Sequence, residues 1–379
     1  RTRPTEHWPT EHWPTEHWQT EHWQTEHWQT EHRQAEHRQA EHWQAERGQA
    51  GDRRSSARPP HHPAEKAWQG LDLAGKATRR RGGPLMSASG SGPCHADHAC
   101  HERVAIVDHR PIAERMWRVR IESPAIAATA VPGQFVMLRI PDRTDPLLAR
   151  PLAVYDVFAG PDGQPRYADF VYAVHGRFTS ALAGMPAGEE LVVWGPLGNG
   201  FDPPPVDHLV LVAGGIGQTA LLALARERAG MARYGTPPRP APLARRITFC
   251  WGARTASLFG DLADFEAAGC DVHLATLDGS QGVAGTVVDL LDQLASAGGF
   301  TSPGPVHVAT CGPEPMMAAV AHWSATRGIR CAVSLETPMA CGIGICFSCV
   351  APIRDDAGGW DYRRTCIEGP VFDSAVVAW

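Results

Sequence analysis

The pattern of apolar and polar positions divides the chain into stretches of different character. The first fifty residues repeat a pentapeptide that begins as Pro4-Thr-Glu-His-Trp8 and decays to Gln44-Ala-Glu-Arg-Gly48. A period of five matches neither the 3.6 residues of a helix nor the 2 residues of a strand, so no single apolar face forms. Arg, Pro, Gly and Ser then dominate to about Pro84. We predict that residues 1–85 are disordered, and we interpret them as a translated upstream repeat joined to a gene that starts at Met86; a His-rich metal-binding tail is the alternative.

A second stretch, residues 86–102, also lacks apolar periodicity. Its Cys and His side chains are metal ligands by type, but their spacing matches no zinc pattern. We therefore predict a flexible tail for residues 86–102. The Cys and His residues concerned are Cys94, His95, His98, Cys100 and His101.

Residues 103–204 change to short β segments that are broken by Pro and Gly. Six such segments at this spacing predict a small antiparallel barrel or sandwich. The segments are Val104–Val107, Met116–Ile121, Phe135–Ile140, Leu152–Phe158, Tyr167–Val174 and Leu191–Val193. Pro203-Pro-Pro205 then forms a stiff break.

Residues 205–330 alternate between strand and helix patterns. This alternation predicts a doubly wound parallel α/β sheet, and residues 331–379 follow it as a small module. The predicted strands are Leu209–Ala213, Ile247–Trp251, Val272–Thr276 and Val306–Thr310. The predicted helices run through Arg228 after the first strand, and then over Leu258–Ala268, Val287–Ala297 and Pro315–Ala325.

Composition narrows the class of protein. The net charge of −6 gives no basic bias toward nucleic acid. No apolar run approaches the roughly 20 residues of a membrane span. All ten Cys follow Met86, and in a cytoplasmic chain they are ligands or buried thiols rather than disulfides. We expect a cytoplasmic protein.

The most informative motif is Cys341-Gly-Ile-Gly-Ile-Cys346-Phe-Ser-Cys349, with Cys366 after sixteen further residues. Three cysteines at x4 and x2 spacing on one loop, with a distant fourth, is the plant-type arrangement for a [2Fe–2S] cluster. The glycines allow tight turns that aim amide N–H groups at the sulfurs. A structural zinc site is the alternative, although zinc usually takes two C-x2-C pairs. The motif therefore indicates an electron carrier.

Four further motifs indicate nucleotide chemistry. Val212-Ala-Gly-Gly-Ile-Gly217 follows a strand and opens a helix, which suits a dinucleotide pyrophosphate; a plain tight turn is the alternative. The Arg that opens Arg150-Pro-Leu-Ala153 suits a phosphate, or is an edge-strand Arg. The glycine-rich connection Gly195–Phe201 suits close passage of backbone by a ligand, or is a linker. Cys311-Gly-Pro-Glu-Pro-Met316 lies at the end of the last predicted parallel strand, where ligands bind, or Cys311 is a small buried hydrophobe.

Together these motifs resemble the dihydroorotate dehydrogenase electron-transfer subunit of the ferredoxin-reductase superfamily, from about Arg103 to Trp379. The most specific part is Glu336-Thr-Pro-Met-Ala-Cys-Gly-Ile-Gly-Ile-Cys-Phe-Ser-Cys349 with Cys366-Ile-Glu-Gly-Pro-Val-Phe372. The resemblance implies an FAD-binding β-barrel (103–204), an NAD-binding α/β domain (205–330) and a [2Fe–2S] module (331–379).

The resemblance also implies site residues. Cluster ligands match Cys341, Cys346, Cys349 and Cys366. FAD contacts match Arg150, Pro151, Leu152 and Ala153, then Val171, Tyr172 and Ala173, then Phe178 and Thr179. Ala153 replaces the family's Ser and Phe178 its Gly, which removes one polar and one backbone contact to the flavin. NAD contacts match Gly214, Gly215, Gly217, Cys311 and Gly312. Asp278-Gly-Ser280 and Gly285 also fit the nucleotide domain, and Arg254 is a candidate partner for the 2′-phosphate of NADP.

The implied function is electron transfer between an FMN-containing catalytic subunit, which oxidises dihydroorotate in pyrimidine biosynthesis, and NAD⁺. The implied assembly holds two copies of each subunit. One alternative is the small subunit of another reductase, of the bifurcating ferredoxin:NADP oxidoreductase or the sulfhydrogenase type; in the former one ligand position is expected to be Asp. A second alternative is a zinc-stabilised module that senses NAD(H).

Overall fold

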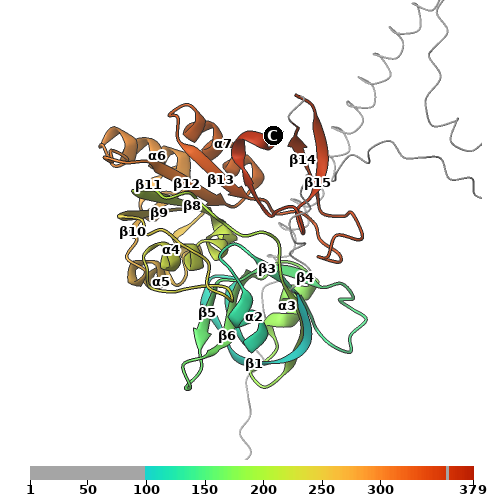
Figure 1. The fold of residues 1–379 in the computed structure, drawn as a ribbon. Helices are drawn as coiled ribbons and strands as arrows, with labels where there is room; N and C mark the ends of the chain where they lie inside the picture. Colours follow the sequence, from blue (N-terminus) through green and yellow to red (C-terminus); the bar gives the residue numbers. More distant parts are fainter. Residues whose placement is uncertain (1–98, 356–357) are drawn as a thin grey trace, which may run out of the picture. The chain divides into compact units, whose positions relative to one another are not determined.

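The computed structural model describes residues 99–355 and 358–379, which form one compact unit. The predictions for residues 1–85, and for Cys94, His95 and His98, lie outside the described residues. Figure 1 labels the elements used below. None of the helices in the described part of the chain is long and apolar enough to cross a membrane.

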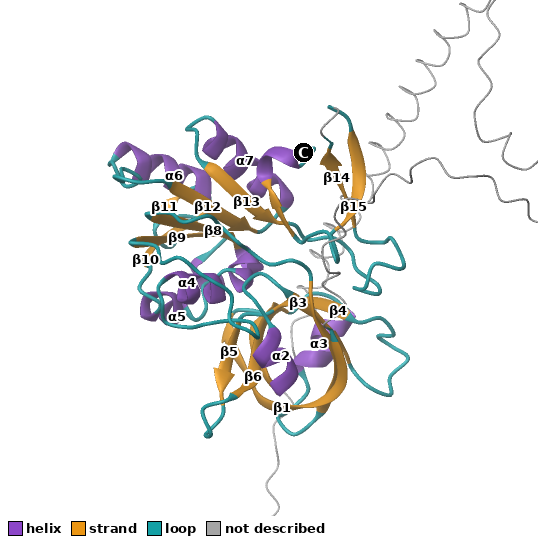
Figure 2. Ribbon diagram, viewed as in Figure 1, coloured by secondary structure: helices purple, strands orange, loops and turns teal. Residues whose placement is uncertain are grey.

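The first half of the described chain is an antiparallel sheet that curls into an open barrel (Figure 2). Its seven strands lie in the order β4-β3-β7-β1-β2-β6-β5, with alternating apolar side chains packed inside. The strands are β1 (Cys100–Ala113), β2 (Met116–Glu122), β3 (Phe135–Arg139), β4 (Arg150–Ala153), β5 (Asp156–Ala159), β6 (Pro165–Ala173) and β7 (Glu190–Leu197). Two short helices, α2 (Pro124–Thr129) and α3 (Arg177–Ala183), accompany them.

Two sequence predictions are corrected in the barrel. Strand β1 begins at Cys100 because Cys100 to Ala105 pair with Gly195 to Glu190 of β7, so Cys100 and His101 belong to the barrel and not to a tail. The predicted strand Leu152–Phe158 is two strands, β4 and β5, which pair with different partners, β3 and β6.

The second half is a doubly wound sheet in the order β11-β10-β9-β8-β12-β13-β16, parallel except for β16. Helices lie on both faces (Figure 2), so each face has its own apolar core. The strands are β8 (His208–Gly214), β9 (Arg246–Ala253), β10 (Asp271–Thr276), β11 (Val283–Ala284), β12 (Val306–Cys311), β13 (Arg330–Ser334) and β16 (Val371–Asp373). The helices are α4 (Leu222–Arg228), α5 (Leu262–Ala267), α6 (Val287–Ser296) and α7 (Glu314–Ala325), with 3₁₀ turns η3 (Gly215–Ala220), η4 (Ala256–Leu258) and η5 (Ser374–Val376).

Strand β13 corrects two further predictions. It pairs in parallel with β12, so the strand that ends at Cys311 is not the last parallel strand. It also spans the predicted domain boundary at residue 330, because its residues complete the nucleotide sheet before the chain leaves it. The helix predicted directly after Gly217 begins instead as the 3₁₀ turn η3.

The cluster segment lies between β13 and β16. After β13 the chain forms the cysteine loop, then the separate hairpin of β14 (Val350–Arg354) and β15 (Trp360–Arg364), and then returns as β16 antiparallel to β13. The hairpin packs through Ala351 and Ile353 onto the core beneath α6 and α7. The segment is therefore held at both ends by one sheet.

Candidate electron-transfer site

The cysteine loop lies directly against the barrel. Gly342 and Gly344 have φ of +73° and +80°, a conformation that glycine adopts without a steric penalty. A Cβ on Gly342 would lie 2.6 Å from Cγ of Met137 in β3 and 3.0 Å from Cδ1 of Leu197 in β7. The absence of a side chain at Gly342 therefore allows the loop backbone to approach the barrel.

The four predicted cluster ligands come together at this loop. Cys349 and Cys366 are each 1% exposed and share an apolar cluster with Met137 and Leu197. Cys341 is partly exposed and Cys346 is exposed. The thiols interact as two pairs, Cys346 with Cys341 and Cys366 with Cys349.

The environments of the paired thiols differ. The Ser348 hydroxyl, 3.2 Å from the Cys346 sulfur, lowers the pKa of Cys346 to about 6. Burial raises the pKa of Cys366 to about 12. Thiolates are the metal-binding form, so Cys346 is the more readily ionised ligand.

The donor set fits a two-iron cluster better than a single ion. Among residues 99–355 and 358–379, no three Cys, His, Asp or Glu side chains converge as around one metal ion. A [2Fe–2S] cluster takes its four Cys as two pairs, one on each iron, and two thiol pairs are present. The amide of Ile343 also donates to the Cys341 sulfur at 3.4 Å, which is the kind of contact that tunes such a cluster.

Three side chains fix the loop from outside. The Trp194 indole N–H in β7 donates to the Cys341 carbonyl at 2.9 Å. The Arg364 guanidinium donates to the Gly344 carbonyl at 2.9 Å and lies 4.7 Å from the centre of the Phe347 ring. Thr365 donates to the Cys349 carbonyl from both its backbone N–H, at 2.7 Å, and its hydroxyl, at 3.1 Å. No sequence motif predicted these contacts, because they join the loop to distant strands.

The residues predicted to bind FAD lie on β4, β6 and the start of α3. Arg150 is exposed, and its guanidinium donates only to the Leu148 and Ala149 carbonyls, so no carboxylate among the described residues neutralises it. Arg177 at the start of α3 forms an ion pair with Asp145 in the loop that leads to β4. These segments therefore meet at one edge, with an uncompensated cation suited to a phosphate.

The second predicted FAD strand has alternating orientations. Ala173 lines the cleft toward the nucleotide domain, and Val171 packs in the core between the domains. Tyr172 faces the barrel interior, where its hydroxyl lies 2.8 Å from Nε2 of His109. Phe178 is also buried in the barrel. Only the backbone of Tyr172 and Phe178 is thus available to a flavin, because their side chains belong to the barrel core.

The predicted NAD residues converge at the carboxyl ends of β8 and β12. A Cβ on Gly217 would lie 2.2 Å from the Cys311 carbonyl oxygen, and one on Gly214 would lie 2.4 Å from Sδ of Met316. Gly312 has a φ of +154° and lies against Gly214. The glycines therefore serve close packing of the two strand ends as well as access for a ligand.

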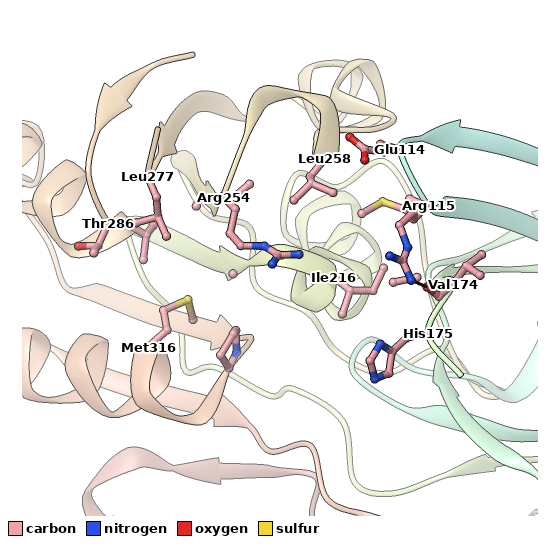
Figure 3. A pocket seen from close by; sticks show the side chains of 18 of the residues that line it. Glu114, Arg115, Val174, His175, Ile216, Arg254, Leu258, Leu277, Thr286 and Met316 are labelled. Carbon is pink, nitrogen blue, oxygen red and sulfur yellow. Dashed lines mark hydrogen bonds between the residues drawn. The ribbon is translucent and has the colours of Figure 1, made fainter. Parts of the chain in front are cut away.

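These strand ends form one wall of a cavity of about 510 Å³ (Figure 3). Gly214, Gly215 and Gly285 line it, whereas Gly217 and Cys311 support it from behind. Arg254 extends into the cavity, and its guanidinium has no hydrogen-bond or ion-pair partner in the described part of the chain. Its size and its free cation suit an anionic nucleotide.

The opposite wall comes from the barrel and was not predicted from the sequence. Arg115, in the β1–β2 turn with a φ of 54°, donates to the Val174 carbonyl at 3.1 Å, and His175 follows β6 (Figure 3). Leu258 of η4 closes one side. An Arg in a tight turn was the only local signal. The cavity thus lies between the two domains.

Two other predicted segments have structural roles. In Gly195–Phe201, the Asn199 side chain donates to the Val371 carbonyl at 2.8 Å and accepts from the Val371 amide at 3.1 Å. This segment therefore connects the barrel to β16. Asp278 and Ser280 form a turn, and the Ser280 hydroxyl accepts from the Ala256 amide at 2.8 Å.

Glu336, which opens the loop, has a chemical signal of its own. Although its side chain reaches the surface, the surrounding protein displaces water and raises the pKa of this carboxyl. Its charge also contributes to the raised pKa of the buried Cys311 thiol, whose main cause is burial. Glu336 therefore lies on the side of the sheet where the nucleotide glycines converge.

Comparison with known proteins decides the family. A family model for the iron–sulfur cluster binding domain of dihydroorotate dehydrogenase B matches residues 336–378. The dihydroorotate dehydrogenase B (NAD(+)) electron transfer subunit of Geobacillus thermodenitrificans is 33% identical over 279 residues, which are 73% of this chain and 98% of that protein. The corresponding subunit of Desulforamulus reducens is 34% identical over 272 residues, which are 71% of this chain and 94% of that protein.

The chain belongs to the dihydroorotate dehydrogenase B electron transfer subunits. The match to an iron–sulfur domain includes all four cysteines of the loop and decides against the zinc alternative. Among solved structures, that of an NADH-dependent reduced ferredoxin-NADP oxidoreductase, described for flavin-based electron bifurcation, aligns with a TM-score of 0.58. It is 28% identical and covers 73% of this chain and 90% of that chain. The predicted ferredoxin-reductase layout of this dihydroorotate dehydrogenase B subunit is confirmed.

Proposed function

We propose that this subunit carries electrons from an FMN-containing dihydroorotate dehydrogenase catalytic subunit, through a [2Fe–2S] cluster and FAD, to NAD⁺. The relatives' name includes both the electron-transfer role and NAD⁺. A flavin exchanges hydride with nicotinamide and single electrons with an iron–sulfur cluster, so it is the required intermediary. The observation that carries the proposal is the seat of Cys349 and Cys366 on Met137 and Leu197 of the barrel.

Each group of residues has a distinct task. Arg150 supplies charge for the flavin phosphates, and the cavity between the domains receives the nicotinamide dinucleotide, with Arg254 and Arg115 for its phosphates. Cys341, Cys346, Cys349 and Cys366 hold the cluster. Apolar packing of the last two ligands against the barrel excludes water and shortens the route between the redox groups.

The catalytic subunit docks on an exposed apolar face beside the cluster. Trp360 and Tyr362 of β15 are 55% and 57% exposed and contact each other edge to face. Arg364 follows on the same side of the strand and stacks on Phe347, which is 62% exposed. These four residues, the hairpin face, form a continuous surface of the type that interfaces bury.

Assembly and location follow from this role. We assign a heterotetramer of two copies of each subunit, working in the cytoplasm, where thiols stay reduced. The nine cysteines in the described residues form no disulfide, in keeping with that setting. Light scattering of the purified complex tests the assembly, and a mass of one copy of each would contradict it.

The decisive experiment separates the two electron-transfer steps. The reconstituted chain is reduced anaerobically with NADH, and flavin and cluster absorbance are followed with and without the catalytic subunit. Cys346→Ser should leave flavin reduction by NADH intact and abolish transfer between the subunits. Cys270→Ser, outside the loop, is the matched control. Equal loss of both steps in Cys346→Ser contradicts the assigned roles, as does a wild-type flavin that NADH leaves oxidised.

The hairpin face is tested separately. Trp360→Ala with Tyr362→Ala should lower affinity for the catalytic subunit roughly a hundredfold, because buried aromatic side chains at interfaces often contribute 2 kcal/mol or more. Leu243→Ala, which removes another exposed apolar side chain, is the control. Unchanged binding of the double variant would exclude this face as the docking site.

A second candidate function is the small subunit of a bifurcating oxidoreductase, favoured by the likeness to that structure. Four cysteines favour the dihydroorotate system, because an Asp is expected at one ligand position in the bifurcating enzyme. Flavin reduction by NADH and by NADPH distinguishes them. Faster reduction by NADPH would support the alternative and would assign Arg254 to the 2′-phosphate.

A further inference from the structure

One buried guanidinium joins the barrel to the nucleotide-binding domain. Arg118 of β2 is 7% exposed. Its Nε donates to Asp169 at 2.6 Å, and its Nη1 donates to Asp261 at 2.9 Å and to Asp264 at 2.7 Å. Asp169 belongs to β6 of the barrel, whereas Asp261 and Asp264 lie at the start of α5. We name these four residues the interdomain clamp.

The surroundings of the clamp leave it dependent on Arg118. Arg120 also binds Asp169, through two hydrogen bonds of 2.6 and 2.9 Å, so Asp169 keeps a cation without Arg118. Asp264 has Arg118 as its only printed ion-pair partner among the described residues, and it accepts a further bond from the Tyr155 hydroxyl at 3.1 Å. Removal of Arg118 therefore leaves the carboxylate on α5 facing the barrel without its cation, an unfavourable arrangement at a partly buried site.

The clamp holds the segment that closes the nucleotide cavity. Just before α5, η4 contributes Leu258 to the cavity wall. The amide of Glu114 in the β1–β2 turn donates to the Ser257 carbonyl at 2.9 Å. Gly260 lies so close to β1 that a Cβ would be 3.0 Å from the Ile112 carbonyl oxygen. Residues 255–264 thus form a wall between the barrel and the cavity.

The backbone of this wall also depends on outside contacts. Asp261 has a φ of +53°, which residues with a side chain rarely adopt and which costs about 1–2 kcal/mol. Its side chain does not cap α5 and is bound by Arg118 instead. The interaction that crosses the domain interface therefore also stabilises the turn into α5.

We propose that Arg118 is a positioning residue for hydride exchange between nicotinamide and flavin. It holds the cavity wall against the barrel, so that a dinucleotide in the cavity meets a flavin on the barrel in reactive geometry. The hydride leaves one ring and joins the other, and Arg118 neither gives nor takes a proton. The proposal rests on the proposed function, because it requires flavin on the barrel and nicotinamide in the cavity.

The test is Arg118→Met in the flavin-loaded chain. The limiting rate of flavin reduction at saturating NADH should fall roughly tenfold to a hundredfold, because small misplacements of reacting groups have effects of this size. Flavin content should be unchanged, because Arg150 lies on β4, away from β2 in the sheet. Hydrogen exchange of residues 255–264 should accelerate in the same variant, with or without NADH.

Three further variants separate positioning from general stability. Arg166→Met removes an exposed pair with Glu122 inside the same sheet and should change neither readout. Arg118→Lys keeps the charge without the fork and should recover part of the rate. Arg118→Met with Asp264→Asn should be faster than Arg118→Met alone, because the unpaired charge is gone.

Two results would overturn the proposal. The first is a normal limiting rate in Arg118→Met with only a lowered melting temperature, which is a purely structural effect. The second is equal losses in Arg118→Met and Arg166→Met. If Arg118→Met does not fold, Asp264→Asn decides, since it should show a smaller rate loss and faster exchange. A wild-type flavin that NADH does not reduce would refute the proposed function instead, and wall exchange would still report on the clamp.

Discussion

Replacement of Gly342 by Ala tests whether the seat of the cysteine loop on the barrel holds the cluster. The new Cβ meets Met137 at 2.6 Å and Leu197 at 3.0 Å, at a φ of +73°. The backbone conformation costs about 1–2 kcal/mol for a residue with a Cβ. Overpacking of a well-packed core adds about 1–3 kcal/mol. The loop should therefore lose roughly 2–5 kcal/mol of its seating free energy.

Gly163→Ala isolates the backbone part of that cost. Gly163 has a φ of +77°, but a Cβ there would meet nothing within 4 Å. Gly344→Ala is intermediate, because its Cβ meets the flexible end of Ile367 at 2.8 Å. The difference between Gly342→Ala and Gly163→Ala, about 1–3 kcal/mol, corresponds to roughly a 5-fold to 150-fold shift in seating.

The assay is iron and acid-labile sulfide per chain, together with the urea concentration that bleaches the cluster absorbance. Gly163→Ala should match the wild type in iron content. Gly342→Ala should hold less iron and bleach at lower urea, with Gly344→Ala between them. Equal iron content and bleaching in Gly342→Ala and Gly163→Ala would refute the reasoning, because contact with the barrel would then be irrelevant to cluster retention.

Three other perturbations have defined outcomes. Arg150→Gln should raise the Kd for FAD roughly 10-fold to 150-fold, from the loss of charged hydrogen bonds worth about 1.5–3 kcal/mol, measured by flavin fluorescence; an unchanged Kd excludes phosphate contact. Burial lowers the pKa of His208 and His307 from 6.5 to about 4, so stability is full above about pH 6.5 and falls as the pH drops toward 4. At pH 5 the loss is about 2 kcal/mol per histidine, and His307→Gln should flatten the pH dependence of the urea midpoint; an equally steep profile would contradict this. Gly217→Ala places a Cβ 2.2 Å from the Cys311 carbonyl and should abolish reduction by NADH while flavin stays bound, as shown by stopped-flow absorbance; normal reduction would contradict the packing argument.

Sequence reasoning succeeded where chemistry is local. The x4 and x2 spacing of Cys341, Cys346 and Cys349 is readable because three ligands lie on one short loop. The strand–helix alternation likewise predicts the parallel sheet, because each element is continuous along the chain. The match of residues 336–378 to an iron–sulfur domain agrees with that local motif.

Sequence reasoning failed where the structure depends on partners far along the chain. Arg115 and His175 reach the cavity only because two turns of the barrel face the nucleotide domain. Strand β13 is short and holds Arg330, Cys331 and Ser334, so its burial depends on neighbours β12 and β16 rather than on an apolar run. Tyr172 was assigned to the flavin, but strand alternation points its side chain inward, which only the register of β6 with β2 decides.

The return of β16 to the side of β13 has a mechanical consequence. A redox module attached by a single linker can swing between partners, but a chain that leaves and re-enters the same sheet has two anchors and little freedom to rotate. The bridge between Ile353 and Val377 adds a third attachment. Electron delivery should therefore proceed without domain excursions, and its rate should be insensitive to solvent viscosity.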